Sequence, residues 1–505
     1  MRKSVFFTLL CIFGLIGFSF LFQKAENNVV VQRLAQHKSE VSENDLETDP
    51  FPSSFSTHLP IIRIDTFAQK IPGSPVGDET GHLSYYETTE DGQSQIKVAY
   101  EVVDDANKWH RLEDSASHSG SALFRIRGNS SRWFAKKSYR LKLVDEENEN
   151  IKESLLNMNE GNEWALYGPF LDKTLIRNYL CMNIASSVVS TWTPEVKFTE
   201  LFIDGEYQGL YLLMEMIDVD EDRVYLSEYE DGDLVVSYMV RVEPHTDPER
   251  QIENFSFYTY RMEQERNFEM IYPGRLLQNE YVKAYVQTDL DEIERKLYAV
   301  ENGQGTHAWK KEIDIDSFVN YYILEEFFSI SDTFSASTYF YRDKRGKLFI
   351  GPVWDFNNAF NNFFQPVETK DFVLAQRGWF GQMMKDKQFT QKVIERYRSL
   401  RKGVLSDEYL LEFIDETVEY LGDAIDRNYE VWGYSFDPYR VSARERRSAK
   451  EGDSTDLERY NPSDYEEAIK WLKRDMLEHA HWLDENIETL LQYCHPSRYN
   501  AQMIE

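Results

Sequence analysis

The chain has 505 residues and a formal net charge of −31, from 56 Lys and Arg against 87 Asp and Glu. This charge argues against nucleic-acid binding by bulk electrostatics, because a polyanion is repelled unless a local basic face is shielded from the rest. Hydrophobic residues make up 42% of the chain and aromatic residues 14%. That composition excludes a disordered protein and supplies enough side chains for a large core.

The three cysteines, Cys11, Cys181 and Cys494, are too few and too dispersed for a disulfide framework or for paired zinc ligands. A single bridge between Cys181 and Cys494 stays open if the protein is exported. The ten histidines include no H-E-x-x-H arrangement, so metalloprotease chemistry has no support in the sequence.

The first 24 residues are typical of a membrane-targeting segment. Arg2 and Lys3 precede an almost entirely apolar run over residues 4–22, which as a helix would span about 28 Å, close to the thickness of the bilayer hydrocarbon. The run is long for a signal-peptide core and no small-x-small site follows it closely, which favours an uncleaved signal anchor over a cleaved signal peptide. The positive-inside rule then places residues 25–505 outside the membrane, and cleavage would make the protein secreted.

Residues 25–58 are polar and acidic and end in Asp49-Pro50-Phe51-Pro52. We expect this segment to be a linker between the membrane and the folded part. A folded domain is predicted over residues 59–430, followed over residues 431–505 by a loop and a helix that pack on it.

Up to about residue 245 the pattern is mainly that of strands. Alternating apolar and polar residues predict strands over 122–127, 138–143, 198–203 and 208–213. The first two flank the small polar turn Gly128–Ser131, and the last two flank Asp204-Gly205, a dipeptide suited to a primed hairpin turn. Between these hairpins, residues 172–187 have helical spacing.

Beyond residue 280 the pattern becomes helical. Apolar residues recur at intervals of three and four over 280–302, 314–330, 388–404, 407–428 and 464–492. A β-rich first half followed by a helix-rich second half predicts an α+β fold, arranged as two lobes with a cleft between them.

Two carboxylates, Asp332 and Asp355, flank a predicted hairpin of two strands, 338–342 and 348–353. Because the second strand returns the chain to where the first began, we expect the two carboxylates to lie close together. One could orient a nucleophile and the other hold Mg²⁺, as phosphoryl transfer requires. On this pattern alone, a solvated or capping role is the simpler interpretation of both.

Five blocks of sequence are more specific than this pattern. They are RGNSS at 127–131 with AKKSYRLK at 135–142, WAL at 164–166 with DKTLIRN at 172–178, DGEYQGLYLLME at 204–215, IDSFVNYY at 315–322, and PVWDF at 352–356. In content and order they resemble the CotH family, the atypical protein kinases similar to spore coat protein H, over roughly residues 120–400.

The resemblance implies a two-lobed kinase-like fold that uses ATP with Mg²⁺ or Mn²⁺. It also implies transfer of the γ-phosphate to Ser or Thr of a secreted or coat-type protein. The G-x-G-x-x-G, H-R-D and D-F-G motifs of ordinary protein kinases are absent from the chain.

By the same resemblance, Arg127 and the turn Gly128-Asn129-Ser130 would lie against the phosphates, where small residues let backbone N–H groups approach. Lys137 would be the lysine that faces the phosphates, with Glu215 as its candidate partner. Lys136 and Lys142 are rivals for this role. Lys137 and Lys142 are predicted on opposite faces of one strand, so both cannot serve equally.

The resemblance assigns Asp332 as the catalytic aspartate and Asp355 and Asn357 as metal ligands. Trp354, or another of the many aromatic residues, would stack on adenine. Many relatives have an Asp where this chain has Asn357, and an amide offers Mg²⁺ less charge than a carboxylate does. Many also have an Asn in the segment after the catalytic Asp, where this chain has Ser335–Thr338.

These departures leave two other functions open. One is a catalytically silent surface protein that uses the fold for assembly or binding, and the other is a nucleotidyl- or aminoacyl-type transferase on the same scaffold. For Asp172, Arg177 and Asn178 the sequence favours a structural role, as a helix N-cap with a buried ion pair.

Overall fold

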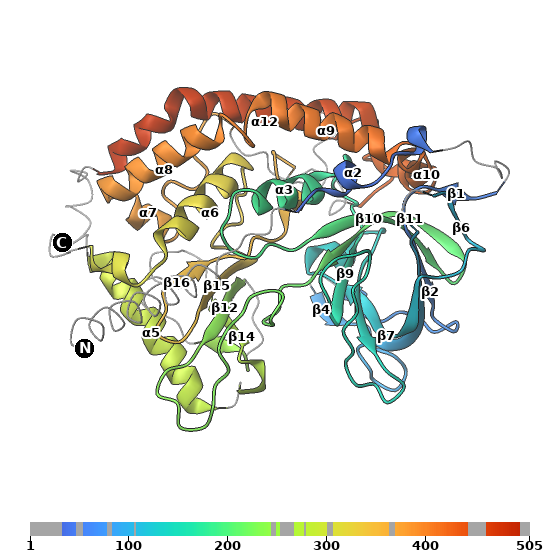
Figure 1. The fold of residues 1–505 in the computed structure, drawn as a ribbon, viewed down its shortest axis with the longest axis horizontal. Helices are drawn as coiled ribbons and strands as arrows, with labels where there is room; N and C mark the ends of the chain where they lie inside the picture. Colours follow the sequence, from blue (N-terminus) through green and yellow to red (C-terminus); the bar gives the residue numbers. More distant parts are fainter. Residues whose placement is uncertain are drawn as a thin grey trace, which may run out of the picture.

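The computed structural model describes residues 33–46, 54–77, 83–105, 108–243, 249–252, 267–276, 279–299, 307–362, 369–442 and 461–494. A β-barrel and a separate five-stranded sheet lie side by side beneath a layer of helices (Figure 1). The barrel precedes the sheet in the chain, and most of the helices follow residue 280. The predicted α+β organisation, with a β-rich first half and a helical second half, is confirmed.

The barrel closes through seven strands. In ring order they are β10 (Val196–Ile203), β11 (Glu206–Glu215), β9 (Glu163–Tyr167), β8 (Ser138–Val144), β7 (His118–Arg127), β5 (Ile96–Val103) and β2 (Ile61–Asp65). The pair β2–β10 is parallel and the other neighbours are antiparallel. Alternation on β7 places Ala122, Phe124 and Ile126 in the barrel core, so Arg125 and Arg127 lie on the opposite face of the strand.

The five-stranded sheet follows in the chain. Its order is β13 (Gln251–Ile252), β14 (Asn267–Tyr272), β12 (Tyr238–Glu243), β15 (Thr338–Arg342) and β16 (Leu348–Ile350). Two short pairs stand apart, β1 (Ser56–Thr57) with β6 (His110–Arg111) and β3 (Pro75–Gly77) with β4 (Leu83–Tyr86).

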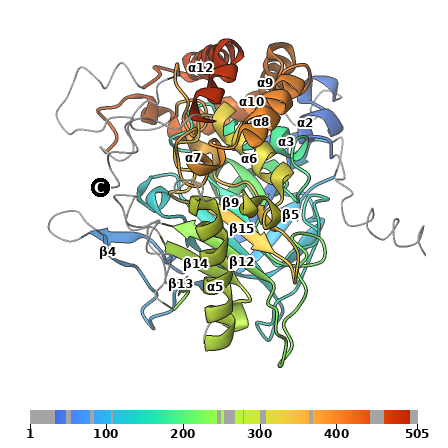
Figure 2. The ribbon, with the colours of Figure 1, turned by 90° about the vertical axis from the view of Figure 1, so that its left-hand side faces the viewer.

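The helices that follow the predicted apolar spacing are α3 (Arg177–Ser186), α5 (Glu280–Tyr298), α6 (Ile315–Phe327), α8 (Lys387–Leu400), α9 (Asp407–Leu421), α10 (Asp423–Trp432) and α12 (Tyr465–Asn486). The short helices α2 (Gln36–Ser39) and α7 (Phe380–Met383) lie outside the predicted ranges. Helices α8, α9 and α12 form the upper layer, and α5 runs along the side of the five-stranded sheet (Figures 1 and 2). The predicted helix 407–428 is divided into α9 and α10, because Gly422 adopts φ +45° and ψ −130° and ends the first helix.

The two predicted hairpins form with the expected turns. Strands β10 and β11 are joined by Asp204-Gly205, whose φ values of +50° and +80° are those of a primed turn. Strands β7 and β8 pair in register, with Arg127 opposite Ser138. Local pattern therefore predicts these hairpins correctly.

Residues 33–46 pack against the folded part, where the sequence predicts a linker. The Phe198 N–H of β10 donates to Gln36 Oε1 at 2.7 Å, and Gln36 is buried. Glu40 accepts from the Tyr420 hydroxyl of α9 at 2.8 Å. The segment thus joins the barrel to the helical layer, and its polar side chains serve as partners in these contacts. We call residues 33–46 the N-terminal strap.

The apolar run over residues 4–22, with the rest of the predicted anchor and residues 25–32 and 47–53 of the linker, lies outside the described residues. Among those described, no helix combines the length and the apolar character needed to cross a membrane. Cys181 and Cys494 are free thiols, so the bridge that the sequence left open does not form.

The strap contains a histidine with a perturbed pKa, which gives a pH-dependent prediction. Burial beside the rings of Tyr179 and Phe413 and the charge of Lys38 together lower the pKa of His37 to about 4, against the opposing effect of Glu416. Since the unfolded chain binds this proton near pH 6.5, the unfolded state holds more protons than the folded state between pH 6.5 and pH 4.

The contribution of His37 to stability is therefore complete above pH 6.5 and is lost as the pH falls toward 4. We expect the free energy of unfolding to decrease by about 2–3 kcal/mol from this group between pH 6.5 and 4.5. Urea unfolding at both pH values, on the wild type and on His37→Phe, checks this. A decrease of equal size in both proteins would contradict the assignment to His37.

Candidate active site

Asp332 and Asp355 line the same small pocket, as the hairpin between them predicts. Asp332 follows α6, and the antiparallel strands β15 and β16, with Phe340 opposite Ile350, return the chain toward its starting point. The pocket is also lined by Trp354, which immediately precedes Asp355. The structure therefore brings together the predicted catalytic aspartate and the predicted metal ligand.

The Asp332 side chain is held from one side. Its Oδ2 accepts a hydrogen bond from Asn358 Nδ2 at 2.9 Å. Its backbone carbonyl accepts from the N–H groups of Ser335 at 2.7 Å and Ala336 at 2.9 Å, which closes a tight turn after the helix. Among the described residues, no donor contacts the other carboxylate oxygen, Oδ1.

The carboxyl and the backbone of Asp355 are both perturbed. The residue is exposed, but the protein atoms around its carboxyl and the nearby charge of Asp332 together raise its pKa to about 6, against the opposing effects of Arg127 and the Ser337 hydroxyl. Its backbone is left-handed, with φ 68° and ψ 56°, a conformation that costs free energy in a residue other than glycine. A carboxylate with a raised pKa in a strained turn is typical of a functional site.

A third acid, Glu325 on α6, lines the same pocket, and the sequence motifs did not point to it. Its Oε2 accepts from the Thr333 hydroxyl at 2.8 Å. Burial, with the charges of Asp332 and Asp355, raises the pKa of Glu325 to about 8, against the opposing effect of the Thr333 hydrogen bond. The sequence does carry a signal, because Glu325 stands within the largely apolar run of a helix whose residues from Ser317 onward are buried.

Two amide side chains complete the oxygen donors near Asp355. Asn357 donates to Asn358 Oδ1 at 3.1 Å, and the Oδ1 of Asn357 is buried without a hydrogen-bond partner among the described residues. The described residues contain no group of three or more His, Cys, Asp or Glu side chains placed to hold a metal ion. The set of carboxylate and amide oxygens nevertheless fits Mg²⁺, which proteins bind through one or two carboxylates together with phosphate oxygens of the substrate.

The barrel contributes a cation to this site. Arg127, at the end of β7, places its guanidinium 5.5 Å from the centre of the Trp354 ring. Burial lowers the pKa of Arg127, and the charge of Asp355 opposes that effect. Arg127 thus lies next to the predicted metal ligand and covers one face of the ring predicted to stack on adenine.

The three lysines that compete for the phosphate role lie in different environments. Lys136 is buried and donates to the Leu210 carbonyl at 2.7 Å and to Asn428 Oδ1 at 2.6 Å, and burial lowers its pKa. Lys142 lies 3.9 Å from a carboxylate oxygen of Glu163. Lys136 and Lys142 are therefore both engaged in structural contacts.

Lys137 lies one residue before β8 and not within it, so the expected opposition of Lys137 and Lys142 across one strand does not apply. Its Nζ donates to the Arg132 carbonyl at 2.7 Å. Arg132 belongs to the short 3₁₀ helix Ser130–Trp133 that follows the Gly128 turn. Lys137 is thereby attached to the predicted phosphate-binding turn.

Glu215, the proposed partner of Lys137, lies at the end of β11 and is fully buried. Its Oε2 accepts from the Glu195 N–H at 2.7 Å, and its Oε1 has no hydrogen-bond partner in the described part of the chain. Burial raises the pKa of Glu215 to about 7 even though the Glu195 hydrogen bond, Arg223 and Arg33 act to lower it. The structure therefore does not pair Glu215 with Lys137.

The turn Gly128-Asn129-Ser130 is exposed at the end of β7. Gly128 has φ +109°, and a Cβ built on it would lie 1.9 Å from Ser131 Oγ. Another residue here would need the Ser131 hydroxyl to rotate away and would hold a φ that side chains other than glycine rarely adopt. Exposed backbone beside Arg127 is the arrangement expected of a turn that approaches phosphates.

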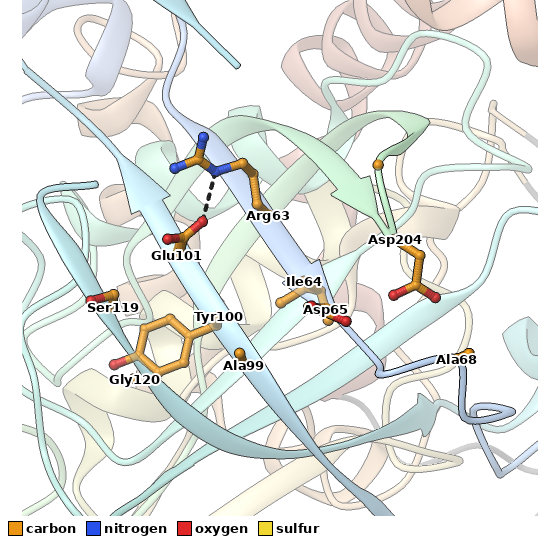
Figure 3. Close-up of a pocket in the computed structure, with 11 residues that line it drawn as sticks. Arg63, Ile64, Asp65, Ala68, Ala99, Tyr100, Glu101, Ser119, Gly120 and Asp204 are labelled. Carbon is orange, nitrogen blue, oxygen red and sulfur yellow. Dashed lines mark ion pairs between the residues drawn. The ribbon is translucent and has the colours of Figure 1, made fainter. Parts of the chain in front are cut away.

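A larger pocket of about 700 Å³ lies on the barrel around β2 and β5 (Figure 3). Its charged groups are already partnered. Arg63 Nε lies 3.0 Å from Glu101 Oε2, and Asp204 accepts from the N–H of Thr66 at 2.7 Å. None of the predicted site residues is among the described residues that line it, so the pocket with Asp332 and Asp355 is the better candidate active site despite its smaller size.

Comparison with known proteins identifies the family. The family model described as CotH kinase protein matches residues 124–483, a range that includes every predicted site residue from Arg127 to Asn357. A search of the curated proteins found no match for the chain. The matched range covers most of the chain and agrees with the motifs read from the sequence, and the chain therefore belongs to the CotH kinase family.

Proposed function

We propose that the chain is an atypical protein kinase that transfers the γ-phosphate of ATP to Ser or Thr of a secreted or coat-type protein. The observation that carries this proposal is the pocket shared by Asp332 and Asp355, with Arg127 beside it. Membership of the CotH kinase family supports the reaction class. The barrel and the five-stranded sheet with its helices would be the two lobes of a kinase-like fold.

In this proposal Asp332 orients the acceptor hydroxyl and accepts its proton at Oδ1, while Asn358 fixes the other oxygen. Asp355 and Asn357 would hold Mg²⁺ or Mn²⁺, which when bound neutralises charge on the phosphates. Arg127 supplies positive charge from the barrel side. Lys137 and the Gly128 turn would orient the phosphates, and Trp354 would contact the adenine.

The cellular location is proposed on the sequence alone. The basic start and the apolar run over residues 4–22 support a signal anchor that leaves the folded part outside the membrane. Removal of the first 24 residues would release it as a secreted protein.

The test is to incubate the purified chain with ATP and Mg²⁺ or Mn²⁺ and to identify the product by mass spectrometry. ADP together with phosphorylated Ser or Thr supports the kinase. Attachment of a nucleotide or an amino acid to the acceptor overturns it in favour of a nucleotidyl- or aminoacyl-type transferase. No modification, together with no thermal shift on addition of Mg²⁺ and ATP, overturns it in favour of the silent assembly protein.

The Gly128 turn gives a quantitative prediction for ATP. Gly128→Ala forces a Cβ against Ser131 Oγ at a left-handed φ, a strain of roughly 1–3 kcal/mol. If this strain changes the backbone conformation of the turn, we expect the KM for ATP to rise by about tenfold or more.

The control for this substitution is Gly232→Ala. Gly232 has a similar φ of +97°, but no atom of the described residues lies within 4 Å of the position that a Cβ would take there. Steady-state kinetics of the two variants should separate them, with KM for ATP unchanged in Gly232→Ala. An unchanged KM in Gly128→Ala would remove this turn from the ATP site.

A further inference from the structure

The first turn of α3 contacts the turn that carries Asp355. The Phe356 N–H donates to Asn178 Oδ1 at 2.9 Å, and Arg177 Nε donates to the Ala359 carbonyl at 2.8 Å. Asn178 and Arg177 are adjacent in α3, whereas Phe356 and Ala359 lie at the two ends of the short 3₁₀ helix after Asp355. Two neighbouring side chains therefore hold both ends of this turn.

The turn is one that needs such support. Asp355, Phe360 and Asn361 have φ values of +68°, +52° and +63°. None of them is glycine, and each such conformation costs of order 1–3 kcal/mol unless the surroundings impose it. The Phe356 N–H would also be buried without an acceptor if Asn178 were absent.

The residues that provide the support are themselves fixed. Asp172 accepts from the Arg177 N–H at 2.9 Å through Oδ2 and from Arg177 Nη1 at 2.6 Å through Oδ1. Asp172, Arg177 and Asn178 are 0%, 3% and 2% exposed. The Asn178 amide also lies near the hydroxyl of Tyr167 on β9 and acts to lower the pKa of that hydroxyl. The buried ion pair expected from the sequence is confirmed. The expected N-cap is not, because the N-cap residue of α3 is Ile176 and it makes no side-chain cap hydrogen bond. The same group of residues reaches the Asp355 turn instead.

We propose that Asn178 is a positioning residue, which holds the backbone of the Asp355 turn so that Asp355 and Asn357 present their oxygens to the divalent cation. The role of the divalent cation in this proposal rests on the proposed function. The hydrogen bond from the Phe356 N–H to Asn178 does not depend on that function. Partners that orient a metal ligand typically change metal affinity or activity by about 10- to 100-fold when they are removed.

The chain offers a matched control on the same helix. Asn183 is 8% exposed, and its Nδ2 donates to the Tyr179 carbonyl at 2.8 Å. No hydrogen bond joins its side chain to the Asp355 turn in the described part of the chain. Asn178→Leu and Asn183→Leu therefore each remove one buried amide from α3, but only the first removes the acceptor of the Phe356 N–H.

The experiment compares the full chain and the two variants by two measurements. The first is hydrogen–deuterium exchange over residues 355–360 without nucleotide, and the second is the Mg²⁺ concentration that gives half of the maximal thermal shift at saturating ATP. We expect faster exchange in Asn178→Leu alone, and a half-saturating Mg²⁺ concentration about tenfold higher or more in that variant alone.

Unchanged exchange in Asn178→Leu, or equal changes in both variants, would overturn the positioning role. An unchanged Mg²⁺ requirement in Asn178→Leu, when the wild type responds normally, would also overturn it. A wild type that shows no thermal shift with Mg²⁺ and ATP would overturn the proposed function instead, and the exchange data would still decide the backbone contact.

If Asn178→Leu does not fold, Asn178→Ser, whose hydroxyl is too short to reach the Phe356 N–H, replaces it. Asn178→Asp, which keeps an oxygen acceptor, should restore slow exchange.

Discussion

Asp332→Asn should abolish phosphate transfer while Mg²⁺ and ATP still bind nearly as well as to the wild type. The substitution keeps an oxygen that can accept the hydrogen bond from Asn358, so the turn should keep its shape. It removes the group proposed to accept the proton of the acceptor hydroxyl, and such a group typically contributes about 100- to 10,000-fold to the rate. The change should appear in kcat and not in the KM for ATP.

A matched control lies at the other end of the same hairpin. Asp343 accepts from the Ser237 hydroxyl at 2.7 Å, in the turn between β15 and β16. Asp343→Asn changes the same chemical group without touching the pocket, so its kcat should stay close to that of the wild type. Retention of most of the wild-type kcat by Asp332→Asn would show that Asp332 is not the proton acceptor.

Arg177→Met should lower the free energy of unfolding more than any other substitution proposed for this chain. Arg177 forms a buried ion pair with Asp172 at 2.6 Å and also bonds the Ala359 carbonyl. Removal of one partner leaves the charge of Asp172 buried and uncompensated, which typically costs about 3–5 kcal/mol. Equilibrium unfolding by urea measures this change in the free energy of unfolding.

The exposed pair of Arg398 with Glu488 provides the comparison, since their side chains are 54% and 63% exposed. Arg398→Met should change the free energy of unfolding by no more than about 1 kcal/mol, because water screens the pair. Similar effects of the two substitutions would mean that the Asp172–Arg177 pair is not a major contributor to the stability of the fold.

The features predicted correctly from the sequence are those that short stretches of chain determine. The Asp204-Gly205 hairpin follows from turn chemistry and from the alternation of its two strands. The proximity of Asp332 and Asp355 follows from the same kind of argument, because a hairpin returns the chain to its start. The family motifs then identified which of the many acids in the chain are the functional candidates.

The features that were missed depend on contacts between distant segments. Composition could not show that Gln36 reaches the backbone of Phe198, 162 residues away, so the N-terminal strap was predicted as a linker. Nothing near Lys136 in the sequence indicates that its Nζ contacts Asn428. The sequence motifs do not include Glu325, because its place in the pocket depends on how α6 lies against the later hairpin.

The central claim is that the pocket containing Asp332 and Asp355 transfers phosphate from ATP. Its most direct test follows label from γ-³²P-ATP into protein, with the wild type and Asp355→Ala measured side by side. We predict that the wild type labels Ser or Thr and that Asp355→Ala incorporates no label above background. Equal incorporation by the two proteins, or no consumption of ATP by the wild type with either Mg²⁺ or Mn²⁺, would contradict the claim.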